Sequence, residues 1–501
     1  MERFYRDLQI GDIHIRDQFQ FELKSEFFPR HEEARGIYTQ EFYLFIPNSL
    51  QVNRDTYSKK QFYRDQTNFI RYKTPEFTFS GLIDPRNPLS PLNRMQVMRG
   101  RIKDPKAVEK VEDELKLLGN IVRSALRKQA AEIIAILEGA EPENVLPIIH
   151  RLHEEVQLFL HNFNDVMLDY LEKSDVISLK THFHYVDEFI SNAISYYATG
   201  ILYTLRKQDR KSFAAADREL CSLIIEEKEN NSENILGVDN PKDKEYFFYK
   251  QGLLNKFILD ALLLNTRRTS SERHLRELIG SFAAGIAMLF FFALFVWQGE
   301  HVTRTSELFI IGTVVLYIIK DRIKENIRNV SYKHAFKWFP DFTTVIRSPD
   351  GKTVLGKLVE SFSFITAKAL PKEIKKVRNR EFHYVLEDFQ RPENVIYHKK
   401  SVRMYPESGE DSSRRYGLNI ITRFSIYHFL EKADDPVQQF LTIDNTNHHF
   451  LDYILPKVYH LNIIMKSSFR NEAGKLEVEI KKFRLIIDKN GIRRIEPIRE
   501  A

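Results

Sequence analysis

Histidine and acidic side chains gather in one stretch of the sequence, THFHYVDEFISNAISYY. On a helix, His184 and Glu188 would lie one turn apart on the same face. Imidazole and carboxylate groups are common zinc ligands. His182, His184 and Glu188 are therefore candidate metal ligands, and a metal-dependent enzyme with its site in a helical bundle is one hypothesis. The alternative is that these side chains are solvated or hydrogen-bonded between helices, because the Glu-x-x-His pair of di-iron bundles is absent.

A second motif, GKTVLGKL at Gly351–Leu358, comes close to the phosphate-binding loop of nucleotide-binding proteins. That loop ends in Ser or Thr because the hydroxyl binds Mg²⁺, and Leu358 has no hydroxyl. The alternation of Val354, Gly356 and Leu358 instead predicts a β-hairpin that turns at Pro349-Asp350-Gly351. Other nucleophile, dinucleotide and Cys-x-x-Cys signatures are also missing. The sequence therefore indicates no specific cofactor and favours a role other than catalysis.

The elements that would position these side chains surround an apolar run, Leu278–Trp297, which contains no ionisable residue. A helix of this length spans the hydrocarbon layer of about 30 Å. Gly280 with Ala284, and Ser281 with Gly285, form small-xxx-small pairs that let another helix approach closely. Trp297 ends the run where an interfacial aromatic residue is expected.

A shorter apolar run, Leu308–Ile319, follows and contains Tyr317 as a second interfacial aromatic. Twelve residues are too few to span a bilayer. Gly312 would offer a point of close approach to the first helix. We expect residues 278–319 to form a two-pass transmembrane helical hairpin, with a single pass as the alternative.

Basic residues flank both ends of this region, whereas the short loop between the runs holds only Arg304. The positive-inside rule then places both flanks and both termini in the cytoplasm, with the protein integral to a plasma (inner) membrane. The flanking residues are Arg267, Arg268, Arg273, Arg276, Lys320, Arg322, Lys324 and Arg328.

The composition of the 501 residues limits the partners and the compartment. A single cysteine, Cys221, excludes internal disulfides and suits a reducing environment. The net charge of +6 is modest, and it concentrates beside the apolar runs, where anionic lipid headgroups explain it without nucleic acid. The first residues show no signal peptide. The expected partners are the lipid bilayer and a protein, either another chain or further copies of this one.

The hydropathy pattern predicts an α+β membrane protein. Residues 1–90 alternate as in strands, residues 104–275 have the spacing of long amphipathic helices in a bundle, and residues 340–501 alternate again in a mostly antiparallel β-rich domain. Residues 320–338 form an amphipathic helix, either a surface helix or a stalk packed on the last bundle helix. A short helix is expected at NHHFLDYILPKVY.

From this organisation we expect a membrane-anchored protein whose large cytoplasmic domains act as a binding, scaffold or sensing module. The metal-dependent enzyme described above is one alternative. The other is an oligomeric channel in which several hairpins line a pore.

Overall fold

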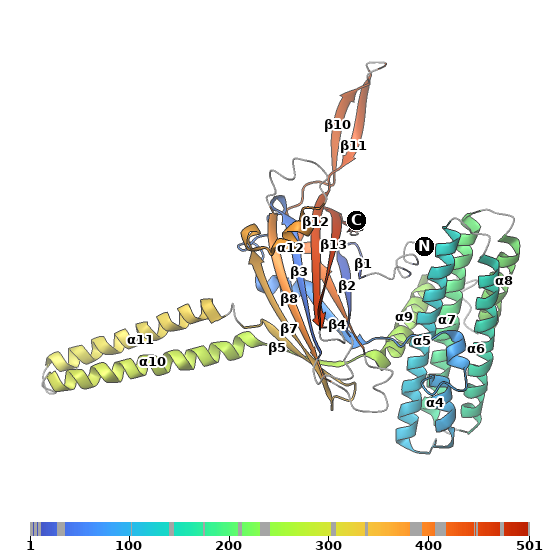
Figure 1. Cartoon of the computed structure of the whole chain (residues 1–501), viewed down its shortest axis with the longest axis horizontal. Coiled ribbons are helices and arrows are strands. Elements are labelled where there is room, and N and C mark those ends of the chain that lie inside the picture. The colour runs from blue at the N-terminus through green and yellow to red at the C-terminus, as the bar shows by residue number, and fades with distance from the viewer. Residues whose placement is uncertain are drawn as a thin grey trace.

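The computed structural model describes residues 12–27, 36–101, 103–139, 145–173, 176–208, 213–230, 241–301, 307–335, 339–380, 393–405, 417–444, 449–470 and 475–498, together with Phe4, Leu8 and Thr446 (Figure 1). The fold is mixed α+β, as expected, with N-terminal strands, a helical middle and a C-terminal antiparallel sheet. Residues 381–389 (EFHYVLEDF), whose sequence alternates as in a strand of the expected C-terminal β-rich domain, lie outside the described residues.

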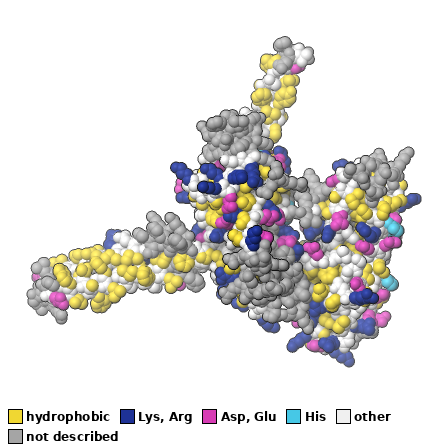
Figure 2. All heavy atoms as spheres, in the orientation of Figure 1, with side chains coloured by type: hydrophobic (Ala, Val, Ile, Leu, Met, Phe, Trp, Pro, Cys, Tyr) yellow, Lys and Arg dark blue, Asp and Glu magenta, His cyan; other side chains and the backbone are white. Residues whose placement is uncertain are grey.

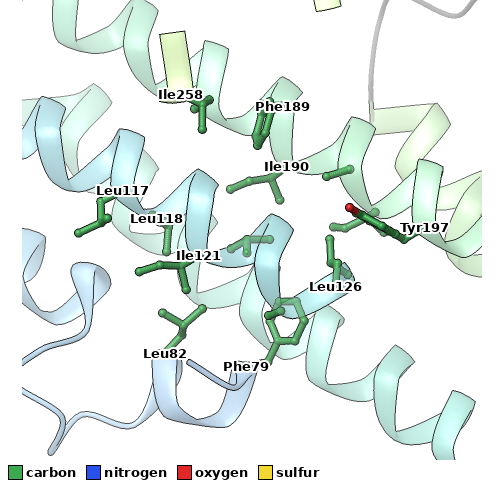
Figure 3. Packing of buried hydrophobic residues seen from close by; sticks show 14 of the residues in the cluster. Phe79, Leu82, Leu117, Leu118, Ile121, Leu126, Phe189, Ile190, Tyr197 and Ile258 are labelled. Carbon is green, nitrogen blue, oxygen red and sulfur yellow. The ribbon is translucent and has the colours of Figure 1, made fainter. Parts of the chain in front are cut away.

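The helical middle is a bundle of long helices at one end of the molecule (Figure 1). Asp104 caps the first long helix by accepting a hydrogen bond from the backbone N–H of Lys106 at 3.0 Å, and Pro105 occupies the first turn. Apolar side chains from α5, α7 and α9 interdigitate with those of the short helix α3 in its core (Figure 3). The helices are α3 (Phe79–Ile83), α4 (Pro91–Met98), α5 (Pro105–Leu137), α6 (Val145–Lys173), α7 (Ile177–Lys207), α8 (Ala214–Asn230) and α9 (Pro241–Leu259).

A β-sandwich forms the centre of the molecule. Its larger sheet is antiparallel throughout, in the order β14-β13-β12-β3-β8-β7-β6-β5. The N-terminal strand β3 lies between two C-terminal strands, so residues far apart in the sequence form one sheet. The strands are β3 (Gly36–Pro47), β5 (Asn265–Ser270), β6 (Phe342–Arg347), β7 (Val354–Ile365), β8 (Glu393–Met404), β12 (Tyr459–Arg470), β13 (Leu476–Asp488) and β14 (Gly491–Ile498).

The smaller sheet has the order β1-β2-β9-β4 and is also antiparallel. Its strands are β1 (Ile13–Ile15), β2 (Gln20–Phe27), β4 (Gln66–Tyr72) and β9 (Leu418–Ser425). Phe21 and Phe424 of this sheet share one core with Phe42 and Leu44 of β3. The helix α2 (Lys59–Asp65) leads directly into β4, and α12 (Lys372–Arg378) contacts β12.

Two antiparallel helices project from the larger sheet, α10 (Ser271–His301) and α11 (Glu307–Ala335) (Figure 1). Only α10 contains a window long and apolar enough to cross a membrane among the described helices, and 11% of that window is buried. Residues 320–335 continue α11 without a break alongside α10, so they do not form a stalk on α9 (Figure 1).

The contacts between α10 and α11 differ from the expected ones. The small residues that α10 turns towards α11 are Ala283 and Ala287, both fully buried, whereas a side chain at Gly280 or Gly285 would meet open space. Gly312 is a point of close approach, as predicted, but it faces Gln298 rather than a small residue. Neither of the two small pairs expected from the sequence therefore faces α11, because the spacing of small residues does not show which side of a helix meets its neighbour.

A β-hairpin, β10 (Val437–Ile443) and β11 (Phe450–Pro456), projects from the opposite region of the larger sheet (Figure 1). The expectation of a short helix at NHHFLDYILPKVY is wrong for Phe450–Pro456. These residues form β11, and all seven of them pair with β10 in an antiparallel arrangement. Cross-strand pairing with β10, which lies outside that segment, decides the conformation.

Candidate functional site

The three candidate metal ligands lie on α7 but turn to different partners. Nδ1 of His182 lies 3.1 Å from a carboxylate oxygen of Glu112 on α5, and Nζ of Lys250 on α9 lies 3.0 Å from Glu188. His184 is exposed. Within the part of the chain that the structure describes, no three His, Cys, Asp or Glu side chains converge as a metal site would require. The short contacts of His182 and Glu188 are with charged side chains of neighbouring helices, not with each other.

The polar residues that do converge lie between the two sheets. On β8, His398 and Lys400 occupy inward positions that alternate with outward side chains, and Lys400 is 1% exposed. On the neighbouring strand β7, Glu360 is directly opposite Lys400 and is fully buried. A buried charge without a partner is costly, so the surrounding hydrogen bonds decide whether this arrangement is stable.

The smaller sheet supplies the partners of these charges from β4 and β9. Nζ of Lys400 donates to Oδ1 of Asn68 at 2.7 Å and to the hydroxyl of Thr422. Nδ2 of Asn68 donates to Oε1 of Glu360 at 2.8 Å, and Nε2 of Gln66 donates to the same oxygen at 3.2 Å. Glu360 and Lys400 are therefore bridged by Asn68, and the polar contacts fix how the two sheets face each other.

The protonation of the cluster follows from its burial and its charges. Burial alone would raise the pKa of Glu360, but His398, 3.4 Å away, and the charges of Lys400 and Arg268 outweigh it and bring that pKa to about 2. Burial lowers the pKa of Lys400 to about 8 despite the nearby Glu360 carboxylate. Burial also lowers the pKa of His398, which keeps its imidazole neutral at pH 7.

The cluster is joined to the start of α10 through Arg268. Nη2 of Arg268 lies 3.3 Å from Oε2 of Glu360, and its guanidinium stacks over the ring of Phe342 at 4.0 Å. Arg268 is part of β5, whose last residue, Ser270, immediately precedes α10. A change in the Glu360 carboxylate therefore acts on the strand that carries the helical hairpin.

Asp341, where the chain enters the sheet after α11, connects the end of the helical hairpin to the sandwich. Its carboxylate accepts hydrogen bonds from the hydroxyl of Tyr63 at 2.9 Å and from the backbone N–H of Phe362 at 2.6 Å, and it pairs with Lys59. Its backbone oxygen accepts the N–H of Ser271, the first residue of α10, at 3.1 Å. Asp341 thus ties both ends of the hairpin to β7 and α2.

A cavity of about 40 Å³ adjoins the cluster between the sheets. Its wall is apolar except for Gln66, His398 and Thr422. A water molecule needs roughly 10–15 Å³ of such space, and pockets for small organic ligands start at about 300 Å³. The cavity therefore suits ordered water next to His398, not a substrate, and the cluster has the character of a structural ionic network.

A larger groove of about 1120 Å³ lies where β1, β13, β14 and α12 meet. Several of its basic side chains are paired within the chain: Lys481 contacts Asp12 at 2.5 Å, and Arg494 contacts Glu496 at 2.7 Å. These ion pairs compete with any external anion, which makes the groove a weaker candidate than the buried cluster.

The predicted membrane-facing residues lie on the projecting hairpin. Trp297 and Tyr317 are both exposed, at 60% and 54%. Of the basic flank, Arg268 is not a headgroup contact but part of the buried cluster, whereas Arg322, Lys324 and Arg328 lie on α11 and Lys320 is partly covered by Tyr317 and Phe291. Arg267 lies on the edge strand β5, and the side chains of Arg273 and Arg276 lie outside the described residues.

Sequence reasoning missed the Glu360 cluster, although a signal was present. In LVESF and IYHKKSV, the polar residues Glu360, His398 and Lys400 fall at positions whose period-two neighbours are apolar. An ionisable residue on the inward face of a strand predicts a buried partner. The identity of that partner, Asn68 on another sheet, could not be read from spacing.

The chain matches no protein-family model, no curated protein and no solved structure.

Proposed function

We propose that this protein is a membrane-anchored module whose β-sandwich is mechanically coupled to a lipid-inserted helical hairpin. The observation that carries the proposal is the path from Glu360 through Arg268 to the first residue of α10. β5 and β6, which bear the hairpin, are hydrogen-bonded strands of the same sheet as the buried cluster. A rearrangement of the sandwich would therefore move the base of the hairpin.

Exposed apolar surface supports lipid as the environment of the hairpin. Phe282, Leu289 and Ile310 are more than 60% exposed, and apolar side chains cover the projecting helices (Figure 2). Soluble proteins rarely expose a continuous apolar patch of this kind. The eleven Leu, Ile, Phe and Val residues of Leu278–Trp297 would favour insertion by roughly 3–6 kcal/mol in total.

The two helices differ in how far their apolar surfaces extend. Gly312 faces Gln298, and the ring centroid of Phe291 lies 5.8 Å from Nζ of Lys320. In this antiparallel register Arg322 is level with Leu289, near the middle of the apolar run. The six charged residues of α11 from Lys320 to Arg328 would cost roughly 15–20 kcal/mol if all faced hydrocarbon. This cost exceeds the gain from α10, so insertion requires that α11 be shielded from lipid.

Membrane insertion is tested by fractionation of the full chain with two matched variants. Phe282→Glu combined with Leu289→Glu places charges on the exposed face of α10, and Val97→Glu places one at an equally exposed site of the helical bundle. We expect the native chain and Val97→Glu to require detergent for extraction, and the α10 variant to be released by alkaline carbonate. Extraction of the native chain without detergent would refute the proposal.

Coupling is tested separately by hydrogen–deuterium exchange in Arg268→Gln. Loss of the contact with Glu360 should increase amide exchange in β5 and β6, because that contact holds the edge strand β5 to the buried Glu360 of β7. Arg267→Gln, at the neighbouring exposed position of β5, is the control and should leave exchange unchanged. Equal exchange in Arg268→Gln and the native chain would contradict the coupling.

A further inference from the structure

In the half of the helical hairpin nearer the larger sheet, the exposed side chains of α10 are mostly apolar and those of α11 are polar. On α10, Phe282 and Leu289 are 67% and 74% exposed and face outward. At the same level on α11, the exposed residues are charged: Asp321, Arg322, Lys324 and Glu325. One side therefore suits hydrocarbon and the other suits water or a polar protein surface.

A single hairpin cannot place both sides in a favourable environment. If the apolar run of α10 spans the bilayer, the charged side of α11 lies within the hydrocarbon layer. If only the part beyond Phe291 and Lys320 inserts, about ten residues give roughly 15 Å, half the thickness of the layer. The tip of the hairpin, with Glu300 near the end of α10 and Glu307 at the start of α11, would then lie inside the hydrocarbon.

We infer that several copies of this chain assemble in the membrane with α10 towards lipid and the charged half of α11 towards a shared polar interior. The inference rests on the proposed membrane insertion and names its partner, a second copy of the chain. Copies in one bilayer share one orientation, so Arg322, Lys324 and Arg328 of each copy lie at the same depth as those of its neighbours. Within each copy Asp321 lies 3.6 Å from Lys320 and Glu325 lies 2.9 Å from Arg328, so these acidic residues offset part of the positive charge and reduce the repulsion between copies.

The outward face of α10 also allows close contact between hairpins. Ser281 and Gly285 are four residues apart and exposed, and a side chain at Gly285 would meet no atom within 4 Å. Small residues at this spacing let helix backbones approach in lipid. Because Ala283 and Ala287 already serve the contact with α11, this second small pair is free for a neighbouring copy.

The arm formed by β10 and β11 points to the same partner. Large apolar residues are exposed on both of its faces, and the side seen in Figure 2 is largely apolar. An isolated two-stranded hairpin is at best marginally stable in water. These residues are Val437, Phe440, Leu441, Ile443, Phe450 and Ile454, with Tyr453 and Leu455. From typical side-chain areas they offer roughly 600–700 Å² of apolar surface on the two faces together, so a contact through the arm needs both faces to approach the area of about 800 Å² that one partner buries in a stable interface.

The direction and charge of the arm favour another copy over lipid. The arm does not follow the axis of α10 and α11, so it extends away from the hairpin (Figure 1). Its two outer edges carry unpaired backbone groups that hydrocarbon could not satisfy. Asp452, which accepts a hydrogen bond from Gln439 at 2.6 Å, is the one charged residue within the two strands, so identical arms would repel each other only through this single charge.

Cysteine accessibility in lipid vesicles tests the arrangement of the hairpin. The full chain with Cys221→Ala would carry either Arg322→Cys on α11 or Leu289→Cys at the same level on α10. We expect a charged, membrane-impermeant thiol reagent to modify the α11 cysteine at least tenfold faster. A fluorophore on the α10 cysteine should be quenched by lipid-attached quenchers. Oxidation should cross-link the α11 cysteine between copies, and mass measurement in nanodiscs should give a multiple of the 59.3 kDa chain.

The outcomes separate this inference from the proposed function. Rapid modification of both cysteines without lipid quenching would show that the hairpin is not in the bilayer, and both proposals would fail. Lipid quenching at the α10 site with a monomeric mass would leave the anchor intact and overturn the assembly. Slow modification of both sites would also overturn it, because the polar interior would then be missing.

The arm is tested by Phe440→Ser combined with Phe450→Ser in the full chain. We expect a lower oligomeric mass or at least a tenfold weaker association than in the native chain. Val97→Ser, at an exposed apolar residue of the bundle, is the control and should associate as the native chain does. Unchanged association of the arm variant would overturn the assignment of the arm as a contact between copies.

Discussion

Nη2 of Arg268 lies 3.3 Å from Oε2 of Glu360, so the strand that leads into α10 is ion-paired with a fully buried carboxylate. The same carboxylate faces Lys400 across the neighbouring strand. One acidic side chain therefore balances two cationic ones, one of them on the strand that leads into α10.

Replacing the carboxylate should be strongly destabilising. Glu360→Gln leaves Lys400 and Arg268 without their counter-charge, and breaking a buried ion pair from one side costs about 3–5 kcal/mol. Thermal unfolding of the full chain in detergent measures this loss. Glu479→Gln, which removes a half-exposed partner of Lys481, should change the free energy of unfolding by less than about 1 kcal/mol. Equal melting temperatures for the two variants would show that the buried pair contributes little.

Acidification should destabilise the fold in two steps. The pKa of His398 in the folded state is below its usual value, so below about pH 6.5 the unfolded chain binds a proton that the folded chain does not, and stability falls. Glu360, with a folded pKa of about 2 against 4.5, adds stability above pH 4.5 that is lost as the pH falls towards 2. Melting temperatures between pH 8 and pH 3 measure both steps. His398→Gln should lack the first step and keep the second, and a native profile in this variant would rule out His398 as its origin.

The lowered pKa of Lys400 predicts how the stability of the fold changes at alkaline pH. Its pKa is lowered from 10.5 to about 8 by burial, so between these values the unfolded chain binds more protons than the folded chain. Stability should therefore rise as the pH increases from 8 to 10.5. Lys400→Met should flatten this part of the curve, as followed by circular dichroism. A rise that persists in Lys400→Met must come from another group.

Close packing of the projecting helices should depend on Gly312. A side chain at this position would meet Nε2 of Gln298 at 2.5 Å, so Gly312→Leu should push α10 and α11 apart. Spin labels at Phe292 and Val315, both exposed, would report a longer distance by pulsed electron paramagnetic resonance. Gly280→Leu is the matched control, because a side chain at that position would also meet no atom within 4 Å. A larger separation in the control than in Gly312→Leu would contradict the observed helix faces.

Several elements could be predicted from local pattern because their physical cause is local. Asp104 and Pro105 begin α5 where a cap and a first-turn proline are expected, and Asp350-Gly351 turns the hairpin between β6 and β7. The helices of the bundle follow the three- and four-residue spacing of their buried side chains. By contrast, Phe450–Pro456 form a strand against the helical expectation, because they pair with β10.

The sequence by itself determined the long helices of the bundle, the alternating pattern of the sheet strands, and that one segment is apolar enough to cross a bilayer, since each depends on residues close together in the chain. Only the tertiary structure decided that Asn68, Glu360 and Lys400 meet between two sheets and that Arg268 belongs to them. It also decided that the charged half of α11 lies beside the apolar α10. Strand order arises from contacts between residues hundreds of positions apart, and the register of α10 and α11 arises from contacts between two separate helices; no local spacing encodes either.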